Sequence, residues 1–437
     1  MRKIVFLVFL LMSGVVSAQD DLSGVDPSGA HVVYWHQYND GPQLEKMNEF
    51  IEEFNSTNEW GITVEGLPQG SYGDIRELMT AAIISGETPN LVAGFQNDAA
   101  SYALEGVVVD LNPYYNDPTW GYSEEEKADL NQDILNVNVF NFEPFNGARL
   151  AWPNQTSALV FVVNLTMLEA LGFDGPPETM EEFREVACAA AEMTGPNGED
   201  VQGFPIPTDS SHFESFVASM GGSIFDGEQY TFTSDEVIAT LQLWQDLYNE
   251  GCAYIPEDRF GNTADFALGL NPMATTSTAG IPFIVADFAE AGIEDEWIVT
   301  TTPWTEGNRT IQVFVPSIIP IVSTPEQQLA TWLFIKFLST TENQVEWTST
   351  TSYFPMRLSA EEMLEDFEAE NPYYAAASDL LADESVNVYA GPQVLSYGAV
   401  RGMVSEAIAN VTANGMDVME VATALNDAAN AAHTGEE

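Results

Sequence analysis

The sequence predicts an α/β protein in which open, mostly parallel sheets are flanked by helices. Strand-like and helix-like segments alternate from residue 30 to residue 104, which is typical of parallel βαβ units. The chain has 437 residues with 45% hydrophobic content, enough to bury large cores. A chain of this length usually forms two domains.

The expected elements follow one another closely along the chain. Strands are expected at 30–36, 62–67 and 91–95, and helices at 43–55, 71–85 and 99–104. Later helices are expected at 180–193, 236–250 and 332–338, followed by a short helix through Trp347 and an extended step at 353–357. Ligands of open α/β sheets bind outside the carboxyl ends of the strands, so interest falls on 36–40, 70–72 and 96–98.

The N-terminus predicts export. Arg2 and Lys3 precede the apolar run 4–12, and 16–18 fits a small-x-small cleavage site. We therefore expect a signal peptide at 1–18; the alternative, a membrane anchor, is disfavoured because the run is too short to span a bilayer. No cysteine lies at the cleavage site, so we expect a soluble periplasmic or extracellular protein that is not a lipoprotein.

The charge balance excludes some partners and suggests a habitat. The formal net charge is -55, from 67 acidic and 12 basic residues. Nucleic acids and anionic membrane surfaces repel such a chain. Self-repulsion of this size needs screening, so we expect a saline habitat. The rival explanation is a site that attracts cations, but such a site needs only a few carboxylates.

The two cysteines, Cys188 and Cys252, are expected to form a disulfide, because an even count in an exported chain favours pairing. Two buried free thiols are the alternative. A zinc site is not expected, since neither cysteine has a second cysteine or histidine at ligand spacing.

Several segments resemble bacterial extracellular solute-binding proteins of the sugar-binding type. WLFIKFLSTTENQVEWTSTTSYFPMRLSA, at 332–360, is similar to a family stretch in which a helix is followed by a crossing between two lobes. GSYGDIRELMTAAIISGETPNLV, FALGLNPMATTST and GPQVLSYGAVRGMVSEAI resemble further family segments in the same order, and AWPNQTSALVFVVNLTMLEALGFDGPPETMEEF departs from the family pattern at Val163.

The resemblance implies a two-lobed periplasmic-binding-protein fold with a hinge. Lobe 1 is expected at 30–146 and 311–352, and lobe 2 at 150–305 and 355–437. The ligand is expected in an interlobe cleft, and the closed form is expected to deliver it to the permease subunits of an ABC transporter. The resemblance implies no cofactor, no metal and no catalysis, and we expect a monomer.

Sugar sites combine aromatic rings, which cover apolar C–H surface, with groups that bind hydroxyls. The resemblance, together with the strand-end loops, gives the candidate ligand-binding residues, which are Tyr72, Phe95, Gln96, Asn97, Asp98, Trp152, Gln155, Thr156, Ser157, Thr275, Thr276, Ser277 and Tyr397. Packing is the alternative for Trp152 and Phe95, and helix capping for Asp98. Asp209 and His212 are weaker candidates.

The segment 391–399, which resembles the family's closing loop, narrows the class of ligand that we expect. Relatives that bind glycerol phosphates carry a cation there, whereas 391–399 contains neither Lys nor Arg, and a phosphate needs charge-assisted donors. We therefore expect a neutral sugar or oligosaccharide. The alternatives are a polyamine or other cationic solute and, less favoured, ferric iron bound by paired tyrosines or an exported glycosidase. No motif of hydrolases, kinases or dinucleotide-binding enzymes is present.

Overall fold

The computed structural model describes residues 22–435 except 142, 196–197, 199 and 258–260, so the expected signal peptide lies outside the described residues. Within these ranges, no helix has both the length and the apolar composition needed to cross a bilayer. The chain forms two compact units. Unit 1 comprises the residues up to 154 together with 316–343 and 356–358, and unit 2 comprises 155–315, 344–355 and 359–437.

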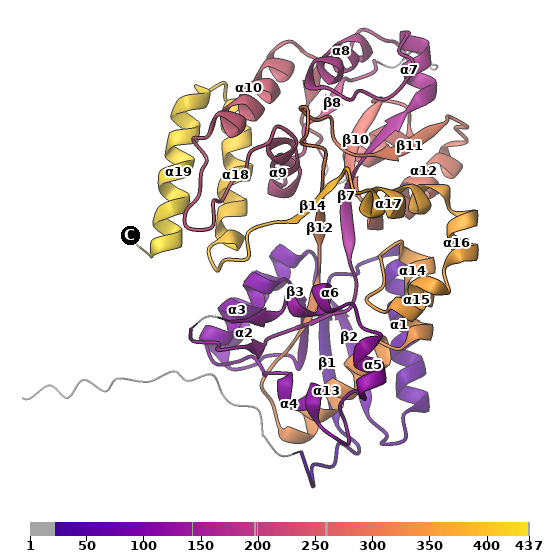
Figure 1. Cartoon of the computed structure of the whole chain (residues 1–437), viewed down its shortest axis with the longest axis vertical. Helices are drawn as coiled ribbons and strands as arrows, with labels where there is room; N and C mark the ends of the chain where they lie inside the picture. Colours follow the sequence, from indigo (N-terminus) through magenta and orange to yellow (C-terminus); the bar gives the residue numbers. More distant parts are fainter. Residues whose placement is uncertain (1–21, 142, 196–197, 199, 258–260, 436–437) are drawn as a thin grey trace, which may run out of the picture. The chain divides into compact units, whose positions relative to one another are not determined.

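Unit 1 begins with the alternating strands and helices that the sequence predicts (Figure 1). Its elements are β1 (His31–His36), α1 (Gly41–Thr57), β2 (Thr63–Pro68), α2 (Tyr72–Ser85), β3 (Leu91–Gly94), α3 (Gln96–Leu104), α4 (Asn112–Asn116), α5 (Glu124–Ala128), α6 (Gln132–Asn136), β4 (Val139–Phe140), β5 (Ala148–Arg149), β6 (Trp152–Pro153), β13 (Ser317–Pro320) and α13 (Pro325–Leu338).

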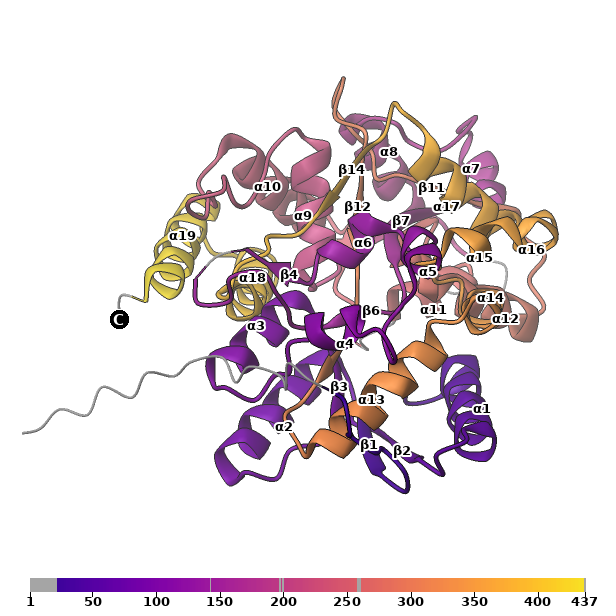
Figure 2. The same cartoon turned by 60° about the horizontal axis from the view of Figure 1, so that its bottom comes forward.

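The sheet of unit 1 has the strand order β2-β1-β3-β13-β6. β1 pairs in parallel with β2 and β3, whereas β13 is antiparallel to its neighbours. α1 and α13 pack together beside β1, where the Phe334 ring lies 5.2 Å from Phe54 and 6.2 Å from Tyr34 (Figure 2). Helix α2 begins with a Ser71 capping box and ends at Gly86, which has a positive φ of 75°.

Unit 2 contains a second mixed sheet with more helices. Its elements are β7 (Ser157–Asn164), α7 (Leu165–Leu171), α8 (Met180–Ala190), β8 (Phe204–Pro205), α9 (Ser210–Ser219), α10 (Asp235–Asn249), β9 (Ala253–Tyr254), α11 (Gly261–Ala267), β10 (Met273–Ser277), η1 (Thr278–Gly280), α12 (Ile281–Ala291), β11 (Trp297–Thr300), β12 (Thr310–Phe314), α16 (Glu365–Glu370), α17 (Pro372–Ala382), β14 (Asn387–Ala390), α18 (Tyr397–Val411) and α19 (Val418–Thr434). α14 (Thr341–Thr351) and α15 (Leu358–Glu362) include residues of both units.

Strand β7 organises unit 2, because all eight of its residues are buried. Successive side chains of a strand point to opposite faces of the sheet. Phe161 and Val163 join one hydrophobic core, with α8, α9, α10, α18 and α19, while Val160 and Val162 join another, with α11, α12 and α17. Figure 1 shows α9, α10, α18 and α19 on one side of β7 and α12 and α17 on the other. β10, β11 and β12 all pair with β7, and β14 extends the sheet beyond β12.

The unit boundaries differ from the expected lobes in several places. Residues 150–154 and 356–358, expected in lobe 2, belong to unit 1, and residues 344–352, expected in lobe 1, belong to unit 2. Residues 311–314 were expected in lobe 1, but β12 pairs with β7 and β14 in the sheet of unit 2. The chain returns to unit 1 after Val315, where β13 pairs with β3. A short strand-like run gives no signal of which sheet it joins, because pairing depends on partners far away in the sequence.

Cys188 and Cys252 form the expected disulfide, which joins α8 to the segment after α10. The cross-link spans 64 residues of sequence, and closing such a loop stabilises by about 4 kcal/mol in the chain-entropy model. We predict that replacing both cysteines by serine lowers the free energy of unfolding by about this amount, measured by denaturant titration. Alkylation of the denatured, unreduced protein at both cysteines, seen by intact mass, would contradict the bond.

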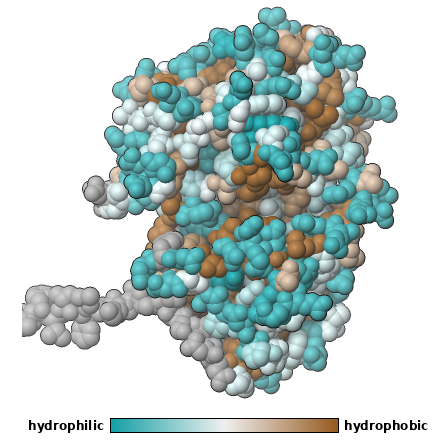
Figure 3. All heavy atoms as spheres, in the orientation of Figure 1, coloured by the Kyte–Doolittle hydropathy of each residue, from teal (hydrophilic) through white to brown (hydrophobic). Residues whose placement is uncertain are grey.

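The surface predicts a dependence on salt. Hydrophilic side chains cover most of the face seen in Figure 3, and the 67 acidic residues of the chain far outnumber the basic ones. We predict that the melting temperature rises as sodium chloride increases from dilute to about molar concentration, because salt screens self-repulsion. Sodium sulfate at matched ionic strength separates screening from salting-out. A flat or falling melting temperature in chloride would remove the inference of a saline habitat.

Candidate ligand-binding site

The three strand-end loops of unit 1 meet at one edge of its sheet, as expected from the parallel pairing of β1, β2 and β3. Asn39, after β1, donates its amide to the carbonyl oxygen of Gly70, after β2, at 3.2 Å. The backbone N–H of Gly70 donates back to Asn39 Oδ1 at 3.1 Å. The rings of Tyr72 and Phe95 lie 4.7 Å apart and remain partly exposed. Unit 1 therefore presents a partly exposed aromatic pair at this edge.

Asp98 is less available than expected. Its side chain is 3% exposed and pairs with Arg76, whose Nε lies 2.6 Å from Oδ1. Its other oxygen accepts the backbone N–H of Phe95 at 3.0 Å. The capping alternative is thus realised. Helix α3 begins at Gln96, three residues earlier than expected, because Asp98 completes its first turn.

Gln96 and Asn97 consequently belong to a helix rather than a loop. The side chain of Gln96 is buried and donates to Ser317 Oγ at 3.3 Å. Asn97 is partly exposed and donates to Asp98 Oδ1 at 3.1 Å. Of these two amides, Asn97 is the one that solvent reaches.

Trp152 is a core residue, so its expected role as a ligand contact is corrected. It is fully buried and stacks on Tyr122, with ring centroids 5.5 Å apart. Its indole N–H donates to Ser339 Oγ at 2.9 Å, and Trp332 packs edge-on against it. A tryptophan enclosed by rings with its N–H already bonded has no surface left for a ligand.

A second edge gathers the expected residues of unit 2. The pairing registers place the start of β7 and the ends of β10 and β12 at one end of the sheet: Ser277 lies opposite Leu159, and Phe314 opposite Ser157. β14, parallel to β12, ends at Ala390 on the same side. The candidates at 155–157 and 275–277 and the segment leading to Tyr397 thus share one edge.

Most of these candidates already have partners in the structure. Gln155 is buried and accepts the indole N–H of Trp347 at 2.7 Å. Thr156 pairs through its backbone with Phe354, and Thr275 Oγ1 lies 2.6 Å from His212 Nδ1. Thr276 is buried, while Ser277 is partly exposed. The partly exposed expected residues are therefore Tyr72, Phe95, Asn97 and Ser277.

Tyr397 lies at the start of α18 and belongs to a polar cluster. Its hydroxyl donates to Glu214 Oε1 at 2.5 Å and accepts from Arg401 Nη1 at 3.3 Å. Arg401 Nη2 contacts both oxygens of Asp209, at 2.8 and 2.7 Å, and Nη1 also donates to Ser211 Oγ. Asp209 and Ser211 flank the start of α9, with Asp209 as its N-cap.

The ionisable groups of this cluster have shifted pKa values. Burial raises the pKa of Glu214, against the opposing effects of the Tyr397 hydrogen bond and the Arg401 charge. Burial also opposes ionisation of Asp209, but Arg401, His212 and Ser211 outweigh it and lower its pKa to about 2. Burial lowers the pKa of His212, partly countered by Asp209. Asp209 therefore stays ionised and His212 neutral at neutral pH.

Sequence reasoning missed Glu214 and gave little weight to Asp209, His212 and Arg401. One signal was available: Glu214 stands between Phe213 and Phe216 on a helix whose residues are otherwise mostly buried. Such a carboxylate needs polar partners from other elements. Those partners come from α18 and β12, and the sequence does not show that these elements adjoin α9.

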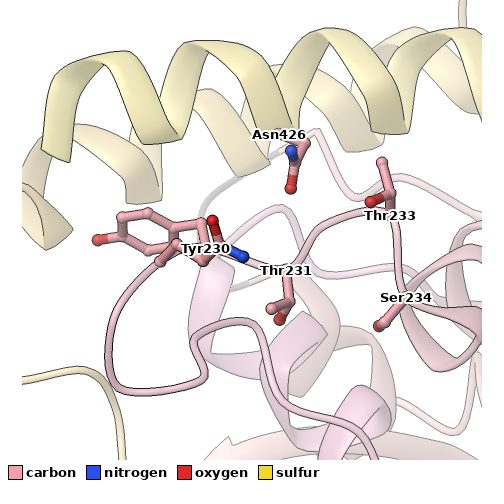
Figure 4. A pocket seen from close by; sticks show the side chains of 6 residues that line it. Tyr230, Thr231, Thr233, Ser234 and Asn426 are labelled. Carbon is pink, nitrogen blue, oxygen red and sulfur yellow. The ribbon is translucent and has the colours of Figure 1, made fainter. Parts of the chain in front are cut away.

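A cavity of about 260 Å³ lies in unit 2, and the hydroxyl of Tyr230, one of its lining residues, lies 3.1 Å from Ser396 Oγ. Residues of the segment before α10 line it together with Asn426 from α19 (Figure 4). The lining consists of uncharged groups, and Asn426 Oδ1 accepts the backbone N–H of Phe232 at 3.0 Å. None of the expected site residues lines this cavity.

Comparison with known proteins identifies the family to which the chain belongs. The sequence profile of bacterial extracellular solute-binding proteins matches residues 49–376, three quarters of the chain. The chain therefore belongs to this family, whose members are the substrate-binding proteins of ABC transporters and not enzymes.

Individual relatives are more distant. The chain is 25% identical to the sn-glycerol-3-phosphate-binding periplasmic protein of Brucella abortus over 366 residues, 78% of each chain. The structure of UgpB from Mycobacterium tuberculosis with glycerophosphocholine superposes with a TM-score of 0.77 at 19% identity, covering 94% of this chain and 99% of that one. A cycloalternan-bound protein from Listeria monocytogenes has a TM-score of 0.77 at 18% identity, covering 92% and 98%.

The Asp209–Arg401 pair predicts a difference in acid stability. A carboxylate with a lowered pKa adds stability above its unfolded pKa of about 3.8, and this stability is lost as the pH falls through about 2. We predict that Asp209→Asn lowers the free energy of unfolding at neutral pH. The difference in free energy of unfolding between the variant and the parent should shrink as the pH falls below about 4. Denaturant titrations across this range test it, and a difference independent of pH would contradict the assignment.

Proposed function

We propose that this protein captures a neutral sugar or oligosaccharide and delivers it to the permease of an ABC transporter. Each unit would contribute its strand-end edge to one ligand molecule, so that the two units act as the expected lobes. The observation that carries the proposal is that each edge presents aromatic or uncharged polar groups while its cation is already paired with a carboxylate.

The pairing of the cations argues against an anionic ligand. Arg401 directs Nη2 to Asp209 and Nη1 to Ser211 and Tyr397, and Arg76 bonds Asp98. A phosphate needs charge-assisted donors, and taking them from a carboxylate would leave that carboxylate without its partner. The 391–399 segment adds no Lys or Arg. The resemblance to glycerol-phosphate-binding relatives therefore does not by itself extend to their ligand.

The cationic alternative has also lost support. A polyamine needs several carboxylates around it, and Asp98 was the carboxylate among the candidate ligand-binding residues. Asp98 is buried and neutralised by Arg76. Asp209, on the edge of unit 2, is paired with Arg401.

A ligand panel tests the proposal. Thermal shift in salt, followed by calorimetry, would compare maltotriose, ribitol, glycerophosphocholine, sn-glycerol 3-phosphate and spermidine. A ligand at one hundred times its dissociation constant adds about 2.7 kcal/mol of stability. We predict that a neutral sugar or polyol stabilises the protein. Tight binding of a glycerophosphodiester, glycerol phosphate or spermidine, with no neutral compound bound, would overturn the proposal.

The aromatic pair of unit 1 gives a site-directed prediction. Phe95→Ala removes a partly exposed ring and should weaken sugar binding by about 1–3 kcal/mol, the scale of covering an aromatic surface. Ile84→Ala is the matched control, because Ile84 is 83% exposed at the opposite end of α2 from Tyr72. Calorimetry with the sugar found in the panel measures both. Equal affinities of the two variants and the parent would remove Phe95 from the site.

Alanine variants of Tyr397 and Asp98 are poor probes of the site. Tyr397 is 8% exposed within a core cluster, and Asp98 is 2% exposed. Alanine at either position would leave buried partners unsatisfied and reduce stability. Tyr397→Phe removes only the hydroxyl and is the better probe. That Tyr397 and the 95–98 segment hold the same ligand remains part of the proposal.

A further inference from the structure

Glu214 is a carboxylate buried among aromatic side chains in unit 2, and its contacts indicate a role beyond packing. Its residue is 3% exposed, and it lies in α9 between Phe213 and Phe216. We propose that Glu214 is a positioning residue that fixes the phenol of Tyr397 at the ligand-binding edge. This inference rests on the proposed function, because it concerns a residue of the same site.

Three donors converge on the carboxylate. Oε1 accepts from the Tyr397 hydroxyl at 2.5 Å and from Ser210 Oγ at 2.8 Å. Oε2 accepts from Gln312 Nε2 at 3.2 Å. The donors come from α18, α9 and β12, so one side chain links three elements of the unit.

The phenol of Tyr397 is confined from other directions as well. Arg401 Nη1 lies 3.3 Å from its oxygen, and the guanidinium lies 5.5 Å from the ring centroid. A Cβ added to Gly391, just after β14, would lie 2.8 Å from the same oxygen. Gly391 has no side chain, so the Tyr397 hydroxyl fits beside it, and Glu214 supplies the acceptor for this hydroxyl. Together these contacts hold the Tyr397 ring in one orientation.

Stability does not account for this carboxylate. Burial raises the pKa of Glu214, so folding favours its neutral form. The neutral form of Glu214 therefore adds stability when the pH is below the ordinary pKa of a glutamate. This stability is lost as the pH rises through the raised pKa of Glu214 in the folded protein. An apolar side chain of similar volume would avoid this loss. Holding Tyr397 gives the carboxylate a function that an apolar side chain could not perform.

The arrangement is sensitive to protonation of Glu214. The groups facing Glu214 are Tyr397 and Arg401 from α18, Asp209 at the start of α9, Gln312 from β12, Tyr389 from β14 and Tyr230 from the segment before α10. Arg401 stays charged, and the pKa of Asp209 is about 2. Protonation puts an O–H donor on Glu214, which now only accepts, so the carboxyl group no longer matches the three donors as they are arranged here.

A ligand-free experiment tests the positioning directly. Tyrosine labelled at Cζ reports the hydrogen bonding of each phenol by NMR, and Tyr397→Phe assigns the Tyr397 signal. Glu214→Met removes the acceptor without leaving an unpaired amide and should shift that signal, whereas Glu214→Gln keeps an oxygen acceptor and should largely restore it. The control is Tyr254, whose hydroxyl donates to Asp265 at 2.6 Å in another part of unit 2 and should not move. An unchanged Tyr397 signal in folded Glu214→Met would overturn the proposal.

Binding then tests the consequence, with maltotriose as the probe. Glu214→Met should weaken binding about tenfold or more in the parent, but should change little in the Tyr397→Phe background. Parent affinity should fall as the pH is lowered and Glu214 becomes protonated, and Glu214→Met should show less of this fall. Equal losses in both backgrounds would indicate a purely structural role and overturn the proposal. Absence of maltotriose binding to the parent counts against the proposed function alone, because the labelled tyrosine still decides the role of Glu214.

Discussion

The double-sided burial of β7 is the constraint on which unit 2 depends. Alternate side chains of this strand enter two different hydrophobic cores, so a shift of one residue would exchange the two sets. That register fixes β10, β11 and β12, which all pair with β7. It also fixes where these strands begin and end, and therefore brings the polar residues of the candidate edge together. The binding edge is in this sense a consequence of how the core is packed.

Scarce positive charge is a second constraint on this acidic chain. Within the described ranges, each lysine and arginine forms an ion pair or a hydrogen bond to a backbone carbonyl oxygen. Lys336 donates to the carbonyl oxygens of Trp120 and Gly121, and Arg149 to that of Leu135. These cations hold segments of the fold in place. The same pairing at Arg76 and Arg401 supports the proposal of a neutral ligand.

Elements with strong local signals were predictable. The first three strands and the first two helices lie within a few residues of their expected positions, because hydrophobic periodicity, Ser71 and Gly86 are local features. The loops that meet at the edge of unit 1 were also predictable, since parallel pairing places the strand ends together. The burial of Trp152 and of Asp98 was not predictable. Trp152 is enclosed by Tyr122 and Asp98 is paired with Arg76, and both partners are distant in the sequence.

The sequence by itself determined the α/β class, the family, the pairing of Cys188 with Cys252 and the chain segments that carry the candidate site. Each of these follows from periodicity, residue counts or the order of motifs. Tertiary structure alone decided which candidate side chains remain accessible and which are already bonded. It also brought Glu214 to Tyr397, 183 residues further along the chain, through the packing of α9 against α18. Hydrogen bonding and burial depend on the neighbours that folding supplies, and a linear pattern does not specify those neighbours.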